Sequence, residues 1–109
     1  MAPMIHRYGI YWTALDPTKG KEVQKTRPSV VVSLDEINAS GVVVVCPLTT
    51  SLHPSWPQRL QIQCAGRDAE IMPDQIRAVS IHRFGKHIHT LSEQDAESLR
   101  DLLSRLYAL

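Results

Sequence analysis

Three short polar segments carry the side chains best suited to chemistry, and each lies where an apolar stretch begins or ends. They are residues 25–28 (Lys-Thr-Arg-Pro), 47–51 (Pro-Leu-Thr-Thr-Ser) and 73–77 (Pro-Asp-Gln-Ile-Arg). Together they supply guanidinium, hydroxyl and carboxylate groups. Rigid strand ends are places where scaffolds usually hold a site. Because Thr, Ser, Asp and Pro are also ordinary turn formers, the pattern alone leaves a purely structural role open.

The stretches around these segments have the composition of β-strands. Residues 29–33 and 42–46 are runs of valine, which are typical of core strands. Residues 59–64 alternate between polar and apolar side chains, so one face of that strand is expected to contact water. Residues 65–68 (Ala-Gly-Arg-Asp) have the composition of a turn. Strands are expected at residues 7–12, 29–33, 42–46, 59–64, 69–72 and 75–80.

Two helices accompany these strands. Leu34 and Ile37 have helical spacing within residues 34–40, so a short helix is expected there, ending before Gly41. Near the C-terminus, Ser92 is a suitable N-cap and is followed by acidic residues in the first turn. An apolar stripe facing the sheet is then expected from Leu99, Leu102, Leu103 and Leu106.

These elements predict a mainly β fold with helices, of the α+β class. We expect a small curled antiparallel barrel with a short helix after the second strand and a C-terminal helix. The 109 residues suffice for a single domain, residues 1–109, with a radius of gyration near ~13 Å. The composition, 43% hydrophobic and 21% charged, argues against disorder. The longest apolar stretch, residues 42–46, is far short of a membrane span, and no secretory signal is expected.

Charge is unevenly distributed along the chain although the formal net charge is only +1. Residues 1–33 contain five basic and two acidic side chains, whereas residues 91–109 contain two basic and four acidic ones. The near-zero net charge excludes whole-molecule binding of the histone type but leaves a local basic patch possible. Most of the basic excess lies in residues 16–28, a polar segment expected to form a long loop. Such a loop is more often functional than structural, the plain alternative being a solvated hairpin.

The cysteines and histidines do not suggest a metal site. Cys46 and Cys64 are the only cysteines, and both are expected to be small buried hydrophobic residues rather than a disulfide. His87 and His89 would share one strand face, with His82 nearby, but zinc needs a third and usually a fourth ligand. We therefore expect neither a metal nor a cofactor.

A series of short motifs runs along nearly the whole chain. It comprises Ile10-Tyr11-Trp12, Leu15-Asp16-Pro17-Thr18-Lys19-Gly20 with Glu22, Thr26-Arg27-Pro28 leading into the valine strand with Ser33, Asn38, Pro47-Leu48-Thr49, Asp74-Gln75-Ile76-Arg77, and Thr90-Leu91-Ser92. No single motif is specific. Their order and spacing resemble the MazF/PemK (Kid) family of toxin endoribonucleases from bacterial toxin–antitoxin pairs.

This resemblance implies an SH3-like barrel, a homodimer, and metal-independent, sequence-specific cleavage of single-stranded RNA, with messenger RNA as the expected target. It also implies a cognate antitoxin whose flexible, acidic C-terminal segment covers the RNA groove, and a place in the bacterial cytoplasm with no membrane contact. The family's catalytic pair falls on Arg27 and Thr49, its loop carboxylate on Glu22, and the acid before Gln on Asp74.

In such a reaction the ribose 2′-hydroxyl attacks the adjacent phosphorus, leaving a 2′,3′-cyclic phosphate and a 5′-hydroxyl. Arg27 is expected to stabilise charge on the non-bridging oxygens, because a guanidinium can bind two of them at once and is a poor base. Thr49 would orient the phosphate. Glu22 and Asp74 would hold Arg27, assist proton transfer, or serve only as structural ion-pair partners. RNA contacts are expected from Lys19, Lys21, Lys25, Thr50, Ser51, Trp56, Gln75 and Arg77.

Trp56 has two interpretations: it could stack on a base, or it could anchor its loop against the barrel. The chain also departs from the family pattern at three positions. Tyr8-Gly9 replaces the Gly-Asp that many relatives carry after Arg7, Lys21 stands where some have His, and Met72 stands where some have a basic residue. A mechanism using those groups is therefore in doubt, whereas one using Arg27 and Thr49 is not.

Two other classes of function stay open. One is a non-catalytic toxin of the same architecture, like the gyrase poison CcdB. That toxin acts through a C-terminal Trp-Gly-Ile, whereas this chain ends with Leu-Tyr-Ala-Leu at residues 106–109. The other is a relative that binds RNA or an antitoxin without cutting.

Overall fold

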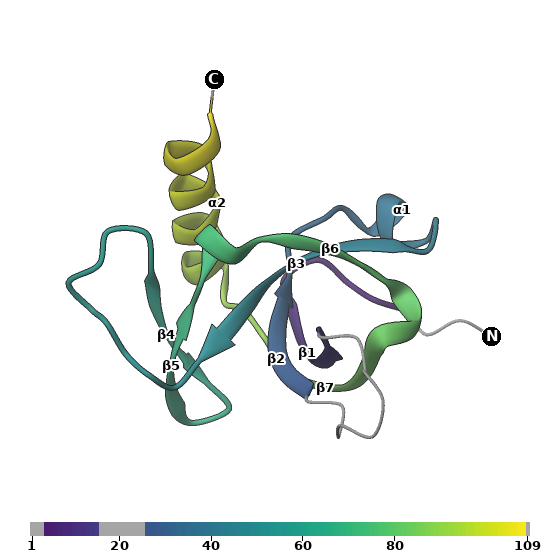
Figure 1. Cartoon of the computed structure of the whole chain (residues 1–109), viewed down its shortest axis with the longest axis horizontal. Helices are drawn as coiled ribbons and strands as arrows, with labels where there is room; N and C mark the ends of the chain where they lie inside the picture. Colours follow the sequence, from purple (N-terminus) through teal and green to yellow (C-terminus); the bar gives the residue numbers. More distant parts are fainter. Residues whose placement is uncertain (1–3, 16–25, 109) are drawn as a thin grey trace, which may run out of the picture.

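The computed structural model describes residues 4–15 and 26–108 and consists of one curled antiparallel sheet with two α-helices (Figure 1). Its strands are β1 (Gly9–Ala14), β2 (Thr26–Val31), β3 (Val42–Thr49), β4 (Leu60–Cys64), β5 (Arg67–Ile71), β6 (Arg77–Ser80) and β7 (Phe84–Thr90). The α-helices are α1 (Asp35–Asn38) and α2 (Glu93–Tyr107), and the 3₁₀ turns are η1 (Pro73–Gln75) and η2 (Ile81–Arg83). This confirms the expected mainly β, barrel-like α+β fold.

Strand β3 is the centre of the sheet. The strand order is β4-β5-β3-β2-β1-β7, and β6 pairs with the first half of β3. One edge of β3 pairs with β2, while the other pairs first with β6 and then, after Pro47, with β5. In Figure 1 the β4–β5 hairpin lies at one side of the molecule, and β1, β2 and β7 gather at the other. Changing partners along β3 is what curls the sheet.

The valine strands are buried on both faces, which explains why they show no alternation. One core contains the row Ile10, Val30 and Cys46 from β1, β2 and β3, and α2 covers it with Leu99. The other core lies on the opposite face and contains, in sequence order, Ile5, Tyr11, Leu15, Val31, Val43, Val45, Val79 and Ile81. Strands β2 and β3 therefore each contribute alternate residues to two different cores.

Helix α2 begins as its sequence predicts, and the Ser92 hydroxyl accepts a hydrogen bond from the backbone N–H of Asp95 at 3.1 Å. Leu99 and Leu102 are buried, but Leu106 is 38% exposed, so the expected apolar stripe is wrong at its last position. The helix extends beyond the sheet in Figure 1, which leaves its final turn without a surface to cover. No helix in the described ranges is long and apolar enough to cross a membrane.

The other expected elements are present with shifted bounds. Strand β2 begins at Thr26, within the segment expected to form a loop, and residues 16–25 of that segment lie outside the described residues. The short helix is confined to Asp35–Asn38, and Gly41 after it has a φ of 102°, a conformation that favours glycine. The expected turn connects β4 to β5 through two residues of positive φ, Ala65 at 50° and Gly66 at 81°. Positive φ at both central residues is the requirement of a tight type I′ hairpin. This turn places the tip of the hairpin beside the site described next.

Candidate functional site

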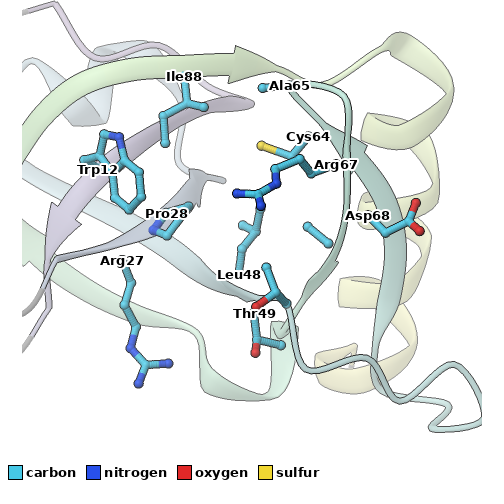
Figure 2. A pocket seen from close by; sticks show the side chains of 12 residues that line it. Trp12, Arg27, Pro28, Leu48, Thr49, Cys64, Ala65, Arg67, Asp68 and Ile88 are labelled. Atoms are coloured by element: carbon cyan, nitrogen blue, oxygen red, sulfur yellow. The ribbon is translucent and has the colours of Figure 1, made fainter.

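Two cavities meet at Arg27. The first, of about 330 Å³, lies between β1–β2 and the β4–β5 hairpin (Figure 2). It is lined by Trp12, Arg27, Pro28, Leu48, Thr49, Thr50, Cys64, Ala65, Arg67, Asp68, Ala69 and Ile88. The second, of about 380 Å³, lies on the other side of Arg27 and is lined by Leu15, Arg27, Pro47, Met72, Gln75 and Arg77. Among the residues that the structure describes, Arg27 is the one common to both linings.

Arg27 and Thr49 lie just beyond the end of the β2–β3 ladder. The last paired residues of β2 and β3 are Ser29 and Pro47, and Arg27 and Thr49, each two residues further along its strand, both line the first cavity. Figure 2 shows both side chains pointing to the same side, away from the apolar lining of the first cavity. The structure therefore brings the two predicted catalytic residues together at the rim where β2 and β3 separate.

Within the described residues, neither the Arg27 guanidinium nor the Thr49 hydroxyl interacts with a charged side chain. Arg27 is exposed, and no other described residue forms a hydrogen bond or ion pair with its guanidinium. The Thr49 hydroxyl oxygen accepts a hydrogen bond from the backbone N–H of Ser51 at 3.0 Å. Accepting that bond fixes the oxygen and leaves the hydroxyl proton available for donation. The pair can thus present a positive charge and an O–H donor to one anionic group.

The first cavity has an apolar floor that continues the core. Trp12 and Pro28 are cross-strand partners, and Leu48 follows on the same face of β3. Trp12 is 43% exposed and borders the cavity. Into this cavity points the guanidinium of Arg67, from the tip of the hairpin (Figure 2). The cavity therefore offers an apolar surface with a cation at its edge.

Arg67 is a site residue that the sequence analysis missed. It stands in a segment with the composition of a turn, in which Arg and Asp are ordinary solvated residues. The conformation of the turn brings it to the cavity: Ala65 and Gly66 adopt positive φ, and Cys64 and Arg67 are then directly paired. No local signal distinguishes such an arginine from one that faces water.

The side chains of the third polar segment, residues 73–77, lie in two different environments. Gln75 and Arg77 line the second cavity with Arg27. The Asp74 carboxylate instead accepts a hydrogen bond from Nε of Arg59 at 3.0 Å. Asp74 is therefore already engaged in an ion pair that does not involve Arg27.

The loop between β3 and β4, residues 50–59, carries the other candidates. Thr50 lines the first cavity, and the backbone of Ser51 binds Thr49. Trp56 is 42% exposed and packs on Arg59, whose guanidinium carbon lies 4.8 Å from the centre of the indole ring. Trp56 thus has a protein support on one side and a solvent-accessible surface. The expected site residues Lys19, Lys21, Glu22 and Lys25 lie outside the described residues.

A buried carboxylate that the sequence analysis did not single out lies beside this loop. Glu70 has no exposed surface and accepts hydrogen bonds from the backbone N–H of His53, from Gln61 and from Arg59. Burial alone would raise the pKa of Glu70, but these three hydrogen bonds and the Arg59 charge outweigh it and lower the pKa. Glu70 is therefore an ionised group held inside the protein.

The cysteines and histidines have ordinary environments. Cys46 and Cys64 are free and buried, and burial, reinforced by the charge of Asp74, raises the pKa of Cys46 to about 12. His87 lies 2.8 Å from the Thr90 hydroxyl and packs edge-on against Tyr11. Among the residues that the structure describes, no group of three or more His, Cys, Asp or Glu side chains could hold a metal ion.

Within the described residues, the structure thus places an exposed guanidinium and a hydroxyl at one rim of a barrel-like antiparallel sheet. The model of the family described as "PemK-like, MazF-like toxin of type II toxin-antitoxin system" matches residues 6–107. The chain belongs to this family, as its motifs predict.

Individual relatives agree. The chain is 29% identical to Endoribonuclease MazF9 of Mycobacterium tuberculosis (strain ATCC 25618 / H37Rv), over 92% of this chain and 93% of the relative. It is 28% identical to the Endoribonuclease toxin MazF of Escherichia coli (strain K12), over 71% and 74% of the two chains.

Solved structures share the fold. The crystal structure of MazF (Form-I) from Deinococcus radiodurans has a TM-score of 0.81 at 20% identity, covering 98% of this chain and 99% of that chain. A MazE-MazF crystal structure (Form-II) from the same organism has a TM-score of 0.81 at 20% identity, covering 95% and 96%.

Proposed function

We propose that this protein is a metal-independent endoribonuclease toxin that cleaves single-stranded RNA at short sequences, using Arg27 and Thr49. The enzyme class is supported by membership of the family and by the endoribonucleases among the relatives. The observation that supports the choice of residues is that Arg27 and Thr49 both line the first cavity beyond the end of the β2–β3 ladder, with no described residue bonded to the Arg27 guanidinium.

The chemistry follows from these two groups. The 2′-oxygen of the ribose forms a bond to the adjacent phosphorus as the bond from phosphorus to the 5′-oxygen breaks. The 2′-hydroxyl loses a proton, the 5′-oxygen gains one, and the products carry a 2′,3′-cyclic phosphate and a 5′-hydroxyl. Negative charge develops on the non-bridging oxygens, and a guanidinium can donate to two of them in one plane. Arg27 stabilises that charge, and the Thr49 hydroxyl donates a hydrogen bond to the same phosphate.

The carboxylates have secondary parts in this proposal. Glu22 is a candidate to hold Arg27 or to accept the proton of the 2′-hydroxyl. Because Asp74 is bound to Arg59, it acts through the structure and not on the reacting phosphate. The flanking RNA is bound by Lys19, Lys21, Lys25, Thr50, Ser51, Trp56, Gln75 and Arg77, to which we add Arg67 for its place in the first cavity.

The partners follow from the same site. The neighbours include MazE-MazF crystal structures and an endoribonuclease in complex with its cognate antitoxin from Mycobacterial species. We propose that a cognate antitoxin with a flexible acidic C-terminal segment binds over Arg27, Arg67 and Arg77, because its carboxylates complement three guanidinium groups. We also propose that the toxin is a homodimer of the bacterial cytoplasm.

The test uses an RNA cleaved by the purified protein in the presence of EDTA. Once a cut is mapped, the same oligonucleotide is made with a single deoxyribose on the 5′ side of the cleaved bond. The proposal expects cleavage of the first substrate only, with a cyclic phosphate at the cut and a 5′ end that kinase labels directly. Cleavage of the deoxy substrate, or cleavage only after a divalent metal is added, would overturn the mechanism. Binding without cleavage would indicate a non-cutting relative instead.

A further inference from the structure

Glu70 is a buried charge that plays no direct part in the reaction proposed above. It lies in β5, where it is paired with Thr49 on one side and with Gln61 on the other. Side chains of directly paired residues share a face of the sheet, so the Glu70 carboxylate lies on the same face as the Thr49 side chain. A buried anion thus stands one strand away from the catalytic hydroxyl.

Two of the three hydrogen-bond donors to this carboxylate, His53 and Arg59, belong to the loop of residues 50–59, and the third is Gln61 of β4. Oε1 accepts from the backbone N–H of His53 at 2.6 Å and from Nε2 of Gln61 at 2.5 Å. Oε2 accepts from Nη1 of Arg59 at 2.8 Å, and Arg59 donates its Nε–H to Asp74. The Arg59 side chain is only 8% exposed, so this is a buried ionic network. Since Glu70 is sealed from solvent and fully bonded, it cannot serve as a base for RNA.

The residues bound by Glu70 bracket the turn that carries Trp56. The backbone N–H of Trp56 donates to the carbonyl of His53 at 3.0 Å, and that of Arg59 donates to the carbonyl of Trp56 at 3.2 Å. The indole ring packs edge-on against the His53 ring, with ring centres 3.8 Å apart, and against the Arg59 guanidinium. Residues 54–57 are exposed. The turn is therefore held at its two ends by a carboxylate and not by an apolar core.

We propose that Glu70 is a positioning residue that fixes the loop of residues 50–59 beside the catalytic pair, and thereby sets the affinity and sequence selectivity for RNA. This inference rests on the proposed nuclease function. Thr49 itself stays in place through the β3–β5 ladder, which does not depend on the network. Loss of the network should therefore loosen the RNA-binding loop more than it disturbs the reacting groups.

The decisive variant is Glu70→Leu/Arg59→Met, which replaces both buried charges by apolar side chains of similar size. Such replacements commonly preserve stability. Because Arg59 also binds Asp74 and packs on Trp56, the double variant removes those two contacts as well. Glu70→Gln, which leaves Arg59 in place and removes only the charge of Glu70, is therefore measured in parallel and should change KM and the cut sites in the same direction. The matched control is Ser33→Ala/Asn38→Leu, which removes a buried polar pair at α1, hydrogen-bonded through the Ser33 hydroxyl and the Asn38 amide.

Cleavage kinetics and the spectrum of cut sites in a randomised RNA pool are measured for each variant. The proposal expects Glu70→Leu/Arg59→Met to raise KM about tenfold, to change kcat by less than about threefold and to broaden the cut sites, whereas the control matches the wild type. A wild-type KM and cut-site spectrum in that variant would overturn the proposal. So would an equal rise of KM in the control, since it would indicate general loosening.

A second measurement does not depend on cleavage. The chain has two tryptophans, so Trp12→Phe leaves Trp56 as the only indole. In that background, Glu70→Gln, which leaves Arg59 against the indole ring, should increase the quenching of Trp56 fluorescence by acrylamide, and the control pair should leave it unchanged. Unchanged quenching would contradict the positioning role. If the wild type does not cleave RNA, the proposed function fails while this measurement still decides whether Glu70 fixes the loop.

Discussion

Replacing Arg27 should separate catalysis from folding more cleanly than any other single change. Arg27 is exposed, and within the described residues its guanidinium has no hydrogen-bonded or ionic partner. Exposed side chains without such interactions contribute little to stability, so Arg27→Ala should change the free energy of unfolding by no more than about 0.5 kcal/mol. Urea denaturation of the two proteins measures this difference in the free energy of unfolding.

The effect on cleavage should be large because the same guanidinium is free to bind the reacting phosphate. A hydrogen bond involving a charged group contributes about 1.5 to 3 kcal/mol. Two such bonds, weakened by solvent at an open rim, give about 3 to 4 kcal/mol, or a loss of about 10² to 10³ in kcat. Arg27→Lys keeps the charge without the planar pair of donors and should lose about tenfold.

The assay is single-turnover cleavage of a fluorescent RNA in EDTA, with Arg105→Ala as the matched control. Arg105 is exposed in the last turn of α2, so its loss lowers the net charge equally but leaves the site intact. The reasoning is refuted if Arg27→Ala cuts at the wild-type rate, or if Arg105→Ala loses as much activity as Arg27→Ala.

Two further predictions concern the titrating groups. Because burial raises the pKa of Cys46 to about 12, iodoacetamide at pH 8 should not alkylate Cys46 in the native protein and should do so in denaturant; rapid native labelling, seen by mass spectrometry, would contradict this. The hydrogen bonds to Glu70 lower its pKa below the ordinary value of 4.5, so its ionised form stabilises the fold above that pH, and the contribution is lost as pH falls through the lowered pKa. Urea midpoints should therefore fall below pH 4.5 more steeply in the wild type than in Glu70→Gln, and parallel curves would show that Glu70 is not responsible.

Much of the fold is predictable from local patterns. The Ser92 cap and the leucine spacing define α2, and the alternation in residues 59–64 defines β4 together with its water-facing side. The valine runs predict β2 and β3 as strands but not their register. Because both faces of these strands are buried, a shift by one residue would still bury valine, and no alternation specifies the partner.

The site is predictable only in part for the same reason. Arg27 and Thr49 are assigned through the resemblance to the toxin family, and their place at one cavity emerges only from the folded sheet. Glu70 alternates with buried Ala69 and Ile71 and so has the pattern of a solvent-facing residue. It is buried because the loop of residues 50–59 folds over that face, a contact that local sequence does not encode.

The central claim is that a guanidinium from β2 and a hydroxyl from β3 act together on one phosphate. A double-mutant cycle of Arg27→Ala and Thr49→Val, read out as single-turnover cleavage, measures this most directly. Groups that act as a unit give non-additive losses, so the double variant should cleave no more than about tenfold more slowly than Arg27→Ala alone. Fully multiplicative losses, or a wild-type rate in either single variant, would contradict the account.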